Sequence, residues 1–569
     1  MTPNTTVLAA RPAGNEVDKP SNNASPTWWK DRGLRSLNLH CGVLMLGSFV
    51  CGFDGSIMNS FFGLDTFLRD MGNPDANQQG LLTAGISLGY LIGFLPASYL
   101  SDRFGRRWPQ ILGAAIVCLA VVLQVTVLGG WEFFGWRILL GFGAAFPLTA
   151  GAAHLFELVH PRQAATMATL FGACYWTGSV TASWSTFGFS YMEASGNNWS
   201  WRAPALLQGL ASLVQLCALY WVPESPRWLV AQGRMEDARA ILAKYHANGD
   251  EEDELIVAEV AEIETAIKLE KETAGFGYLD FFKTKGNRYR LFLVVWIGFM
   301  TQVKLTLSPL SEEDVKKRWS VSGAWDGTGC GQKQKSGTSR DMLTSSSPEQ
   351  FLGNTLISYY LLPILDTLGV VETASQQGIN GGLQVFNLVT AVTASVFIDR
   401  FSRRFTWLFS TVGVLICFSI ITVTSAVYDK NTSVHAGRAT IAFIFLYSAL
   451  YNISWSIQFY SYVLEILPYG QRTKGMAVCL LVDYAALFFA QYANPPAFNA
   501  MGWKYYTIYI AIIAVNVVVV YLYFPETAGL TLEQSAALLD GSDANARLSE
   551  AAKTAVEAEG GKKDDELSV

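Results

Sequence analysis

The chain has 569 residues, of which 51% are hydrophobic and 15% are charged, and its formal net charge is -6. This composition is too apolar for an ordinary soluble protein, and its mildly acidic balance gives no support to a role with nucleic acid. The sequence shows no nucleophile-base constellation and no metal-binding spacing of cysteine or histidine, so we expect neither an enzyme nor a bound metal or cofactor.

The first 38 residues form a polar tail that we expect to be disordered and cytoplasmic. Twelve apolar runs follow, each able to supply the roughly 20 residues that a helix needs to cross a bilayer. They cover 39–60, 81–100, 109–128, 133–156, 166–190, 203–222, 289–366 with an interruption, 381–398, 405–427, 439–466, 475–494 and 504–524. We therefore predict an all-α polytopic membrane protein with two six-helix bundles, 39–222 and 289–524, and a C-terminal tail, 525–569.

Positive charges gather in alternate loops between the apolar runs. By the positive-inside rule these loops are cytoplasmic. The basic residues concerned are Lys30, Arg32, Arg35, Arg103, Arg106, Arg107, Arg400, Arg403, Arg404, Arg472 and Lys474. We expect a multi-pass protein of the plasma membrane with both termini in the cytoplasm.

A polar stretch, 223–288, separates the two predicted bundles. It has a helical pattern from Met235 to Tyr245 and a charged run from Glu251 to Glu272. This pattern predicts amphipathic helices on the cytoplasmic side.

Residues 303–350 interrupt the seventh apolar run with 13 charged side chains. Each such charge costs about 2.5–3.5 kcal/mol at the centre of a transmembrane helix, so this insert cannot lie in the hydrocarbon. Joining Gln302 to Phe351 would restore one span of ordinary length. Because every codon of Val303 begins with GT and one codon of Gln350 is CAG, we hypothesise that the insert is a translated intron. The alternative is a genuine long loop on the outer side.

One basic hexad occurs twice, each time between the second and third apolar runs of its half. The two copies are Asp102-Arg103-Phe104-Gly105-Arg106-Arg107 and Asp399-Arg400-Phe401-Ser402-Arg403-Arg404. The repetition indicates a duplicated chain with both hexads on one side of the bilayer. Arg and Asp in such a tight turn can pair with backbone carbonyls and helix ends of the neighbouring half, which would latch one conformational state. A generic positive-inside loop would explain the arginines but not the repeated Asp.

With these motifs the chain resembles a sugar porter of the major facilitator superfamily, most of all the fungal lactose-permease and hexose-transporter branch. The first hexad matches the superfamily signature, and Ser402 replaces its glycine in the second. Pro223–Trp228 and Pro525–Gly529 are similar to the paired sugar-porter motifs after helices 6 and 12. The resemblance extends the latch to Glu157, Glu224, Arg227, Glu465, Arg472 and Glu526.

One departure from the family concerns the loop after the fourth span. Where the family usually places an arginine that pairs with the glutamate of helix 4, this chain has Ala164. Whether the nearby Arg162 takes over that ion pair is open at this point.

Asp54 lies within the first predicted span, where an ionisable side chain is functional by default. Arg137 opens or lies within the fourth span. In proton-coupled sugar porters that this chain resembles, an aspartate and an arginine at these places form a pair. A nearby guanidinium keeps the carboxylate ionised, and protonation would break the pair and let the bundles move. A purely structural ion pair is the alternative.

Sugar hydroxyls need hydrogen-bond donors and acceptors, and pyranose faces need aromatic surfaces. The resemblance implies sugar contacts from the following residues in helices 7, 8, 10 and 11: Gln302, Asn354, Tyr359, Tyr360, Asn387, Tyr460 and Asp483. Tyr460 stands where many relatives carry tryptophan, and Gly172 where they carry glutamine. These departures make glucose a doubtful substrate. Asp483 could bind a hydroxyl, pair with a cation or join the proton path, or it could be purely structural.

The sequence therefore predicts a secondary active transporter that carries a mono- or disaccharide together with a proton by alternating access. Its predicted partners are the sugar, the proton and the lipid bilayer. An uncoupled sugar facilitator and a non-transporting sugar sensor are the alternatives, and the short tail after residue 535 argues against the sensor. A product that retains 303–350 could also be inactive, because its seventh helix would be split.

Overall fold

The computed structural model describes residues 23–25, 27–193, 196–273, 278–302, 361–362, 364–365, 368–370, 372–397, 401–456, 458–467, 471–527 and 539. These residues fold into helices and contain no β-strand. The long helices of the first half are α1 (Arg32–Phe61), α3 (Ala76–Phe104), α4 (Arg107–Thr126), α5 (Gly130–Leu158), α6 (Ala164–Ser190) and α7 (Trp199–Ala218). Those of the second half are α11 (Lys285–Gln302), α14 (Thr373–Phe397), α15 (Arg403–Asn431), α16 (Val434–Tyr451), α17 (Gln458–Ile466), α18 (Arg472–Met501) and α19 (Tyr505–Tyr523).

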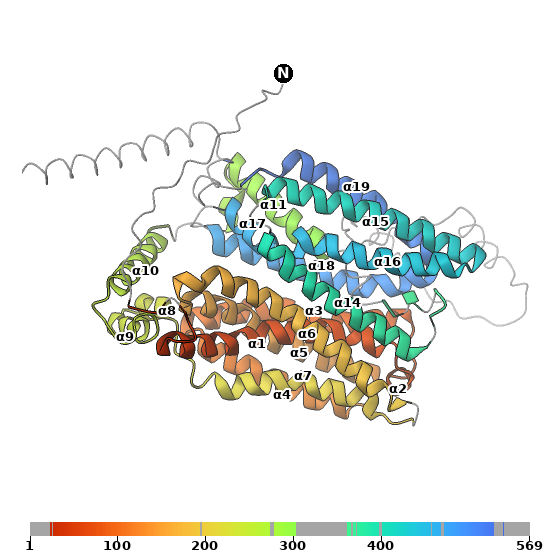
Figure 1. The fold of residues 1–569 in the computed structure, drawn as a ribbon, viewed down its shortest axis with the longest axis horizontal. Coiled ribbons are helices and arrows are strands. Elements are labelled where there is room, and N and C mark those ends of the chain that lie inside the picture. Colours follow the sequence, from red (N-terminus) through yellow and green to blue (C-terminus); the bar gives the residue numbers. More distant parts are fainter. Residues whose placement is uncertain are drawn as a thin grey trace, which may run out of the picture.

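The same helix pairs pack together in both halves. In the first half α1 packs on α6, α3 on α5, and α4 on both α5 and α7; in the second half the matching pairs are α11 on α18, α14 on α16, and α15 on both α16 and α19. The two bundles lie one above the other in Figure 1, joined where α18 packs along α3 and α14 along α6. This repeated packing is the two-bundle, twelve-helix fold that the duplicated sequence predicts.

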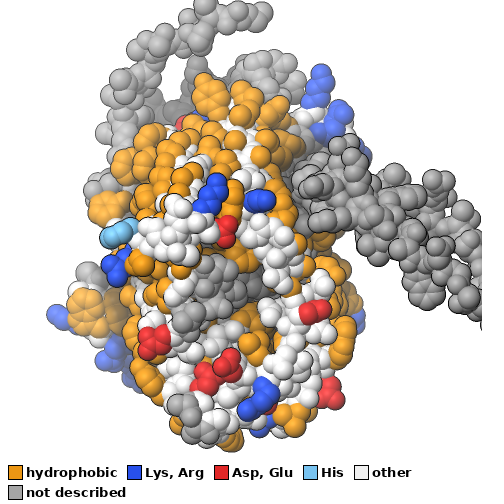
Figure 2. Space-filling model, turned by 90° about the vertical axis from the view of Figure 1, so that its right-hand side faces the viewer, with side chains coloured by type: hydrophobic (Ala, Val, Ile, Leu, Met, Phe, Trp, Pro, Cys, Tyr) orange, Lys and Arg blue, Asp and Glu red, His pale blue; other side chains and the backbone are white. Residues whose placement is uncertain are grey.

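The surface of the bundles suits a membrane. Seven segments of the described chain are long and apolar enough to cross a bilayer by their own composition: Arg32–Phe61, Ala76–Phe104, Arg107–Thr126, Gly130–Leu158, Arg403–Asn431, Val434–Ser456 and Lys474–Tyr523. Figure 2 shows the end of the molecule away from α8, α9 and α10, with polar and charged side chains toward its middle and hydrophobic side chains along its flanks. A protein whose sides face lipid and whose ends face water has this distribution.

The first helix begins earlier than the sequence predicts. It starts at Arg32 because Asp31 caps it: the Asp31 carboxylate accepts a hydrogen bond from the backbone N–H of Leu34 at 2.9 Å. Residues 32–38 are therefore helical and do not belong to a disordered tail. A short helix that the sequence analysis did not predict, α2 (Asp65–Asp70), follows α1.

Three helices follow α7: α8 (Pro226–Ala231), α9 (Met235–His246) and α10 (Glu254–Thr273). α8 packs on α5 and α9 on α1, and α10 packs on α8 and α9. They lie at one end of the molecule in Figure 1. The His246 ring Nε2 lies 3.1 Å from the Leu158 carbonyl at the end of α5, and Asn248 Nδ2 donates to the Asp31 carboxylate at 2.8 Å. The linker helices are thus tied to the first half at the ends of α1 and α5.

Several predicted features lie outside the described residues. They are the insert 303–350, the sugar-contact candidates Asn354, Tyr359 and Tyr360, and the hexad residues Asp399 and Arg400. The backbones of Gln302, Tyr460 and Arg472 are helical, and their side chains lie outside the description.

Candidate functional site

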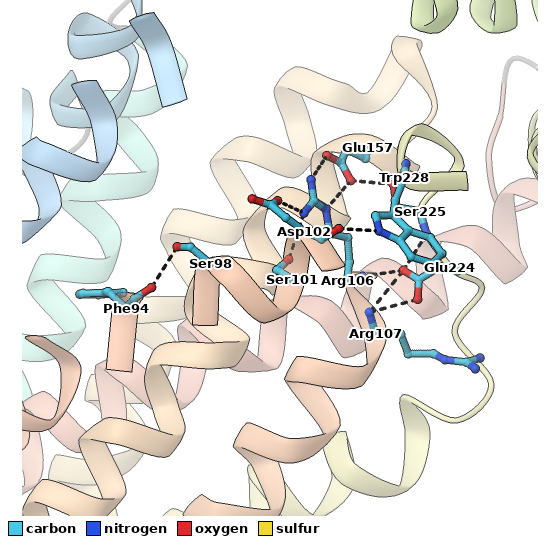
Figure 3. A network of polar contacts seen from close by, with 10 residues as sticks. All are labelled: Phe94, Ser98, Ser101, Asp102, Arg106, Arg107, Glu157, Glu224, Ser225 and Trp228. Carbon is cyan, nitrogen blue, oxygen red and sulfur yellow. Dashed lines mark hydrogen bonds and ion pairs between the residues drawn. The ribbon is translucent and has the colours of Figure 1, made fainter. Parts of the chain in front are cut away.

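A compact ionic network encloses the first hexad (Figure 3). The Arg106 guanidinium makes two contacts of 3.1 Å with the Glu157 carboxylate at the end of α5, and its third nitrogen lies 2.9 Å from Asp102. Ser225, at the start of α8, donates its hydroxyl to Glu157 at 2.6 Å. A bidentate arginine–carboxylate pair has a fixed geometry, so this network holds α3, α5 and α8 together.

Glu224 closes the same network through backbone contacts. Its carboxylate accepts hydrogen bonds from the backbone N–H groups of Arg106 at 2.8 Å, Ser225 at 3.0 Å and Arg107 at 3.3 Å. Gly105 makes this approach possible: its backbone has φ 89 and ψ 177, a conformation that only glycine adopts readily. A Cβ at this position would lie 2.6 Å from the Glu224 carboxylate. The glycine of the signature is therefore explained by both its conformation and the lack of space.

The second half repeats the arrangement. Glu526 accepts from the backbone N–H groups of Arg403 at 2.8 Å and Arg404 at 3.1 Å, as Glu224 does from Arg106 and Arg107. Arg403 pairs with Glu465 at 3.3 Å. Thr527 donates its hydroxyl to Glu465, in the place of the Ser225 contact with Glu157. The two networks are therefore pseudo-symmetric, including the hydroxyl groups of Ser225 and Thr527 that bind Glu157 and Glu465.

A further matched pair was not identified from the sequence. His154, three residues before Glu157, places its Nε2 atom 2.8 Å from the Pro223 carbonyl. Tyr462, three residues before Glu465, donates its hydroxyl to the Pro525 carbonyl at 2.9 Å. The equal spacing before the two glutamates is the sequence signal that could have revealed them.

Among the residues that the structure describes, the side-chain hydrogen bonds of the first hexad stay within the first half and the linker, which differs from the expected pairing across the halves. Arg103 donates to the Tyr99 hydroxyl at 2.9 Å, and Arg107 to the Val222 carbonyl at 3.3 Å. In the second half, Arg404 donates to the Tyr521 carbonyl. Arg227 is half-buried at the start of α8. Each network therefore ties together the helix ends of one bundle.

Arg162 does not replace the missing arginine of the fourth loop. Its guanidinium donates to the backbone carbonyl of Ala24 at 3.3 Å, and Glu157 is already bound by Arg106 and Ser225. Arg162 instead anchors the segment that precedes α1.

Asp54 and Arg137 are both completely buried in the first bundle, in α1 and α5. One carboxylate oxygen of Asp54 accepts a hydrogen bond from Gln208 on α7. The Arg137 guanidinium reaches the backbone carbonyl of Asp54 at 3.5 Å, so the direct partner of the carboxylate is Gln208. Among the described residues, the other carboxylate oxygen has no hydrogen-bond partner. A buried carboxyl with a vacant oxygen can take up a proton with little rearrangement, because ionisation leaves that oxygen poorly compensated.

The second bundle also contains a buried carboxyl, Asp483. It is buried in α18, and within the described part of the chain its Oδ1 atom has no hydrogen-bond partner. A role for Asp483 in the sugar site or the proton path stays a prediction.

A stripe of amides runs along α14. Its members, spaced by three or four residues and all buried, are Gln377, Asn380, Gln384 and Asn387. Asn380 receives a hydrogen bond from Asn59 at 3.0 Å and donates to Ser60 at 3.0 Å, both on α1. The stripe therefore forms a polar contact between the bundles. The sequence analysis selected only Asn387, although the helical spacing was visible.

At Asn387 the amide stripe meets a break in the tenth predicted span. Asn387 accepts a hydrogen bond from Asn452 at 3.1 Å, and Asn452 opens a π-helical turn at Asn452–Ser456. Such turns often mark functional sites in helices.

Comparison with known proteins identifies the family. Residues 40–305 and 342–539 match the model of the family described as "Sugar (and other) transporter". The chain therefore belongs to this family of multi-pass membrane transporters, and it is not an enzyme. The resemblance to sugar porters of the major facilitator superfamily is confirmed.

The individual relatives share only about a quarter of their residues with this chain. A high-affinity glucose transporter of Kluyveromyces lactis is 26% identical over 512 residues, which cover 86% of this chain and 83% of the relative. The MFS-type transporter oryC of Aspergillus oryzae is 25% identical, with coverage of 85% and 81%. Among solved structures, the xylose transporter XylE from E. coli has a TM-score of 0.65 at 20% identity, with coverage of 87% and 99%. This structural likeness supports the fold.

Proposed function

We propose that this protein is a proton-coupled sugar transporter that works by alternating access. The observation that carries the proposal is the completely buried carboxyl of Asp54, which lies beside Arg137 and has one oxygen that makes no hydrogen bond to any residue that the structure describes. A carboxyl in the middle of a transporter bundle is expensive to ionise and is retained where it carries a charge or proton.

The proposed mechanism follows from the contacts of Asp54. In the ionised state the carboxylate is stabilised by Gln208 and by the positive field of Arg137. Protonation removes that attraction and lowers the free energy needed to separate α1 from α5 and α7. Because α1 also carries Asn59 and Ser60, which contact α14, the protonation state of Asp54 would bias the equilibrium between the outward-open and inward-open states.

The sugar site of the proposal includes the amide stripe of α14. Buried amides offer the donors and acceptors that hydroxyl groups need, and the stripe lies where the two bundles meet. We expect Gln384→Leu to raise the KM for sugar about tenfold, since one lost hydrogen bond to a polar ligand costs about 1–1.5 kcal/mol. Thr393→Val, on an exposed face of the same helix, is the matched control and should leave KM unchanged.

Support for a sugar comes from relatives named for glucose transport and from a structural neighbour described as a proton:xylose symporter. The MFS-type transporters among the relatives carry no sugar in their names, so the substrate panel must be wide.

The test of the proposed function is uptake of radiolabelled mono- and disaccharides by transporter-deficient cells at two external pH values. We expect at least one sugar to be concentrated at low external pH and a protonophore to abolish the accumulation. Uptake that only equilibrates and ignores the protonophore would identify an uncoupled facilitator. Specific binding of a sugar without uptake would identify a sensor.

We also propose that the protein resides in the plasma membrane with both termini and the linker helices in the cytoplasm. The basic hexads and the linker helices supply the positive charge that this orientation requires. Protease digestion of sealed right-side-out vesicles should leave an epitope tag at either end intact.

We further infer that 303–350 is absent from the working transporter. The family model matches up to residue 305 and resumes at residue 342, so it passes over 306–341, inside the insert. Sequencing the mature message should reveal a transcript without the 144 bases that encode the 48 residues. Transcripts that all contain these bases would refute the inference.

A further inference from the structure

A pocket of about 450 Å³ lies between the first hexad and the linker helices. Its lining residues come from the α3–α4 turn, the loop after α7, α8 and α9, all in the first half of the chain or the linker. It therefore lies apart from the amide stripe and from Asp54. The residues that matter for its chemistry are Arg107, Trp108, Glu224, Trp228, Arg234 and Lys244.

Two cations of this pocket have no carboxylate partner in the described part of the chain. The Arg107 guanidinium donates to the Val222 carbonyl and lies 5.7 Å from the Trp108 ring centre, while its Nε atom is buried without a hydrogen bond. Lys244 is exposed, with its Nζ atom 5.2 Å from the centre of the Tyr245 ring.

The other charged side chains of the pocket already have hydrogen-bond or ion-pair partners. Glu224 is bound by the backbone N–H groups of the hexad, and Arg234 pairs with Asp237 at 2.7 Å. The pocket therefore presents an excess of positive charge, carried by Arg107 and Lys244, to an incoming ligand.

Exposed aromatic side chains lie in and beside the pocket and form its aromatic rim. Phe104 and Trp108 line the pocket and are about half exposed, at 50% and 56%. Tyr220 and Trp221 follow α7, where the Tyr220 carbonyl accepts from Arg107 at 3.5 Å, and they are exposed to 70% and 69%. Aromatic side chains of this kind mark the level of the lipid headgroups. Basic pockets at this depth on the cytoplasmic side are suited to the headgroups of anionic lipids.

We propose that this pocket binds the phosphate headgroup of an anionic phospholipid. Arg107 and Lys244 would bind the phosphate oxygens, and Trp108 and Trp228 would flank the headgroup. The choice of a lipid over free phosphate rests on the proposed cytoplasmic orientation and on the aromatic rim; it does not require that the cargo be a sugar.

The test is native mass spectrometry of the purified full-length protein with dioctanoyl phosphatidylinositol 4-phosphate. We expect Lys244→Gln to raise the Kd about fivefold and Lys244→Glu about 25-fold, because each unit of charge contributes about a factor of five near a lipid headgroup. The matched control is Lys268→Gln on α10, an exposed lysine paired with Glu264 at 2.8 Å, which should change the Kd by less than a factor of two.

Equal weakening by the Lys244 and Lys268 variants would overturn the proposal, because it would indicate non-specific attraction. Equally tight binding of dioctanoyl phosphatidylcholine would do the same. Displacement of the lipid by an equal concentration of inorganic phosphate would reassign the pocket to a soluble anion and overturn the lipid assignment. Because binding is measured without sugar, failure of the transport proposal would not alter these results.

Discussion

Each of the two bundles carries the same ionic network at one of its ends, built around a different turn. In the first half the turn residue is Gly105, with positive φ and no room for a side chain beside Glu224. In the second half it is Ser402, with φ -67 and a hydroxyl that accepts from the Phe405 N–H at 3.2 Å and caps α15. Each glutamate is nevertheless held by the backbone N–H groups of two consecutive arginines.

The difference shows which part of the hexad is the same in both networks. In both halves the backbone N–H groups of the two arginines bind a glutamate, whereas the residue before them differs because the turn has a different backbone conformation in each half. A sequence signature that requires glycine therefore describes the first half only. Exchanging residues between the two networks tests this difference.

Exchange of the turn residues should have the largest effect. Gly105→Ser forces a side chain into a glycine-only conformation and against Glu224, so we expect a loss of about 1–3 kcal/mol of stability. Ser402→Gly loses only a cap and should cost a few tenths of a kcal/mol. Thermal unfolding of the two purified variants measures the difference. Equal losses would contradict the conformational explanation.

Neutralising the two backbone-bound glutamates should have the next largest effect. Glu224→Gln and Glu526→Gln replace charge-assisted hydrogen bonds with neutral ones, and we expect each to slow sugar uptake about tenfold, a change of about 1.4 kcal/mol. Glu132→Gln, an exposed change at the other end of α5, is the control. Wild-type rates in both network variants would show that the networks are dispensable.

Removing the matched contacts to the proline carbonyls should have the smallest effect. His154→Phe and Tyr462→Phe each leave a carbonyl without its partner, at a cost of about 0.5–1.5 kcal/mol. Replacing His154 by tyrosine, the residue of the second half, should retain more stability than replacing it by phenylalanine. Identical melting temperatures for the tyrosine and phenylalanine variants would show that the carbonyl contact contributes nothing.

Sequence patterns predicted the features that depend on local composition. The apolar runs located the spans, and the repeated hexads indicated two related halves, because each is visible within a short window. The amide stripe from Gln377 to Asn387 was also readable from its helical spacing, although only its last member was selected.

Contacts between helices that are far apart in the chain could not be predicted from local sequence patterns. Gln208 is one amide in an apolar run, and only the approach of α7 to α1 makes it the partner of Asp54. The meeting of Asn59 with Asn380 likewise joins residues more than 300 positions apart. Such pairings depend on the register between helices, for which one sequence carries no local signal.

The account depends most on Asp54 as the carrier of the coupled proton. Its most direct test is the Asp54→Asn variant in proteoliposomes, assayed for sugar accumulation under an imposed pH gradient and for sugar exchange without one. We predict that accumulation is lost while exchange continues within about threefold of the wild-type rate, because asparagine keeps the size and the Gln208 contact but cannot ionise. A variant that still concentrates sugar would contradict the account.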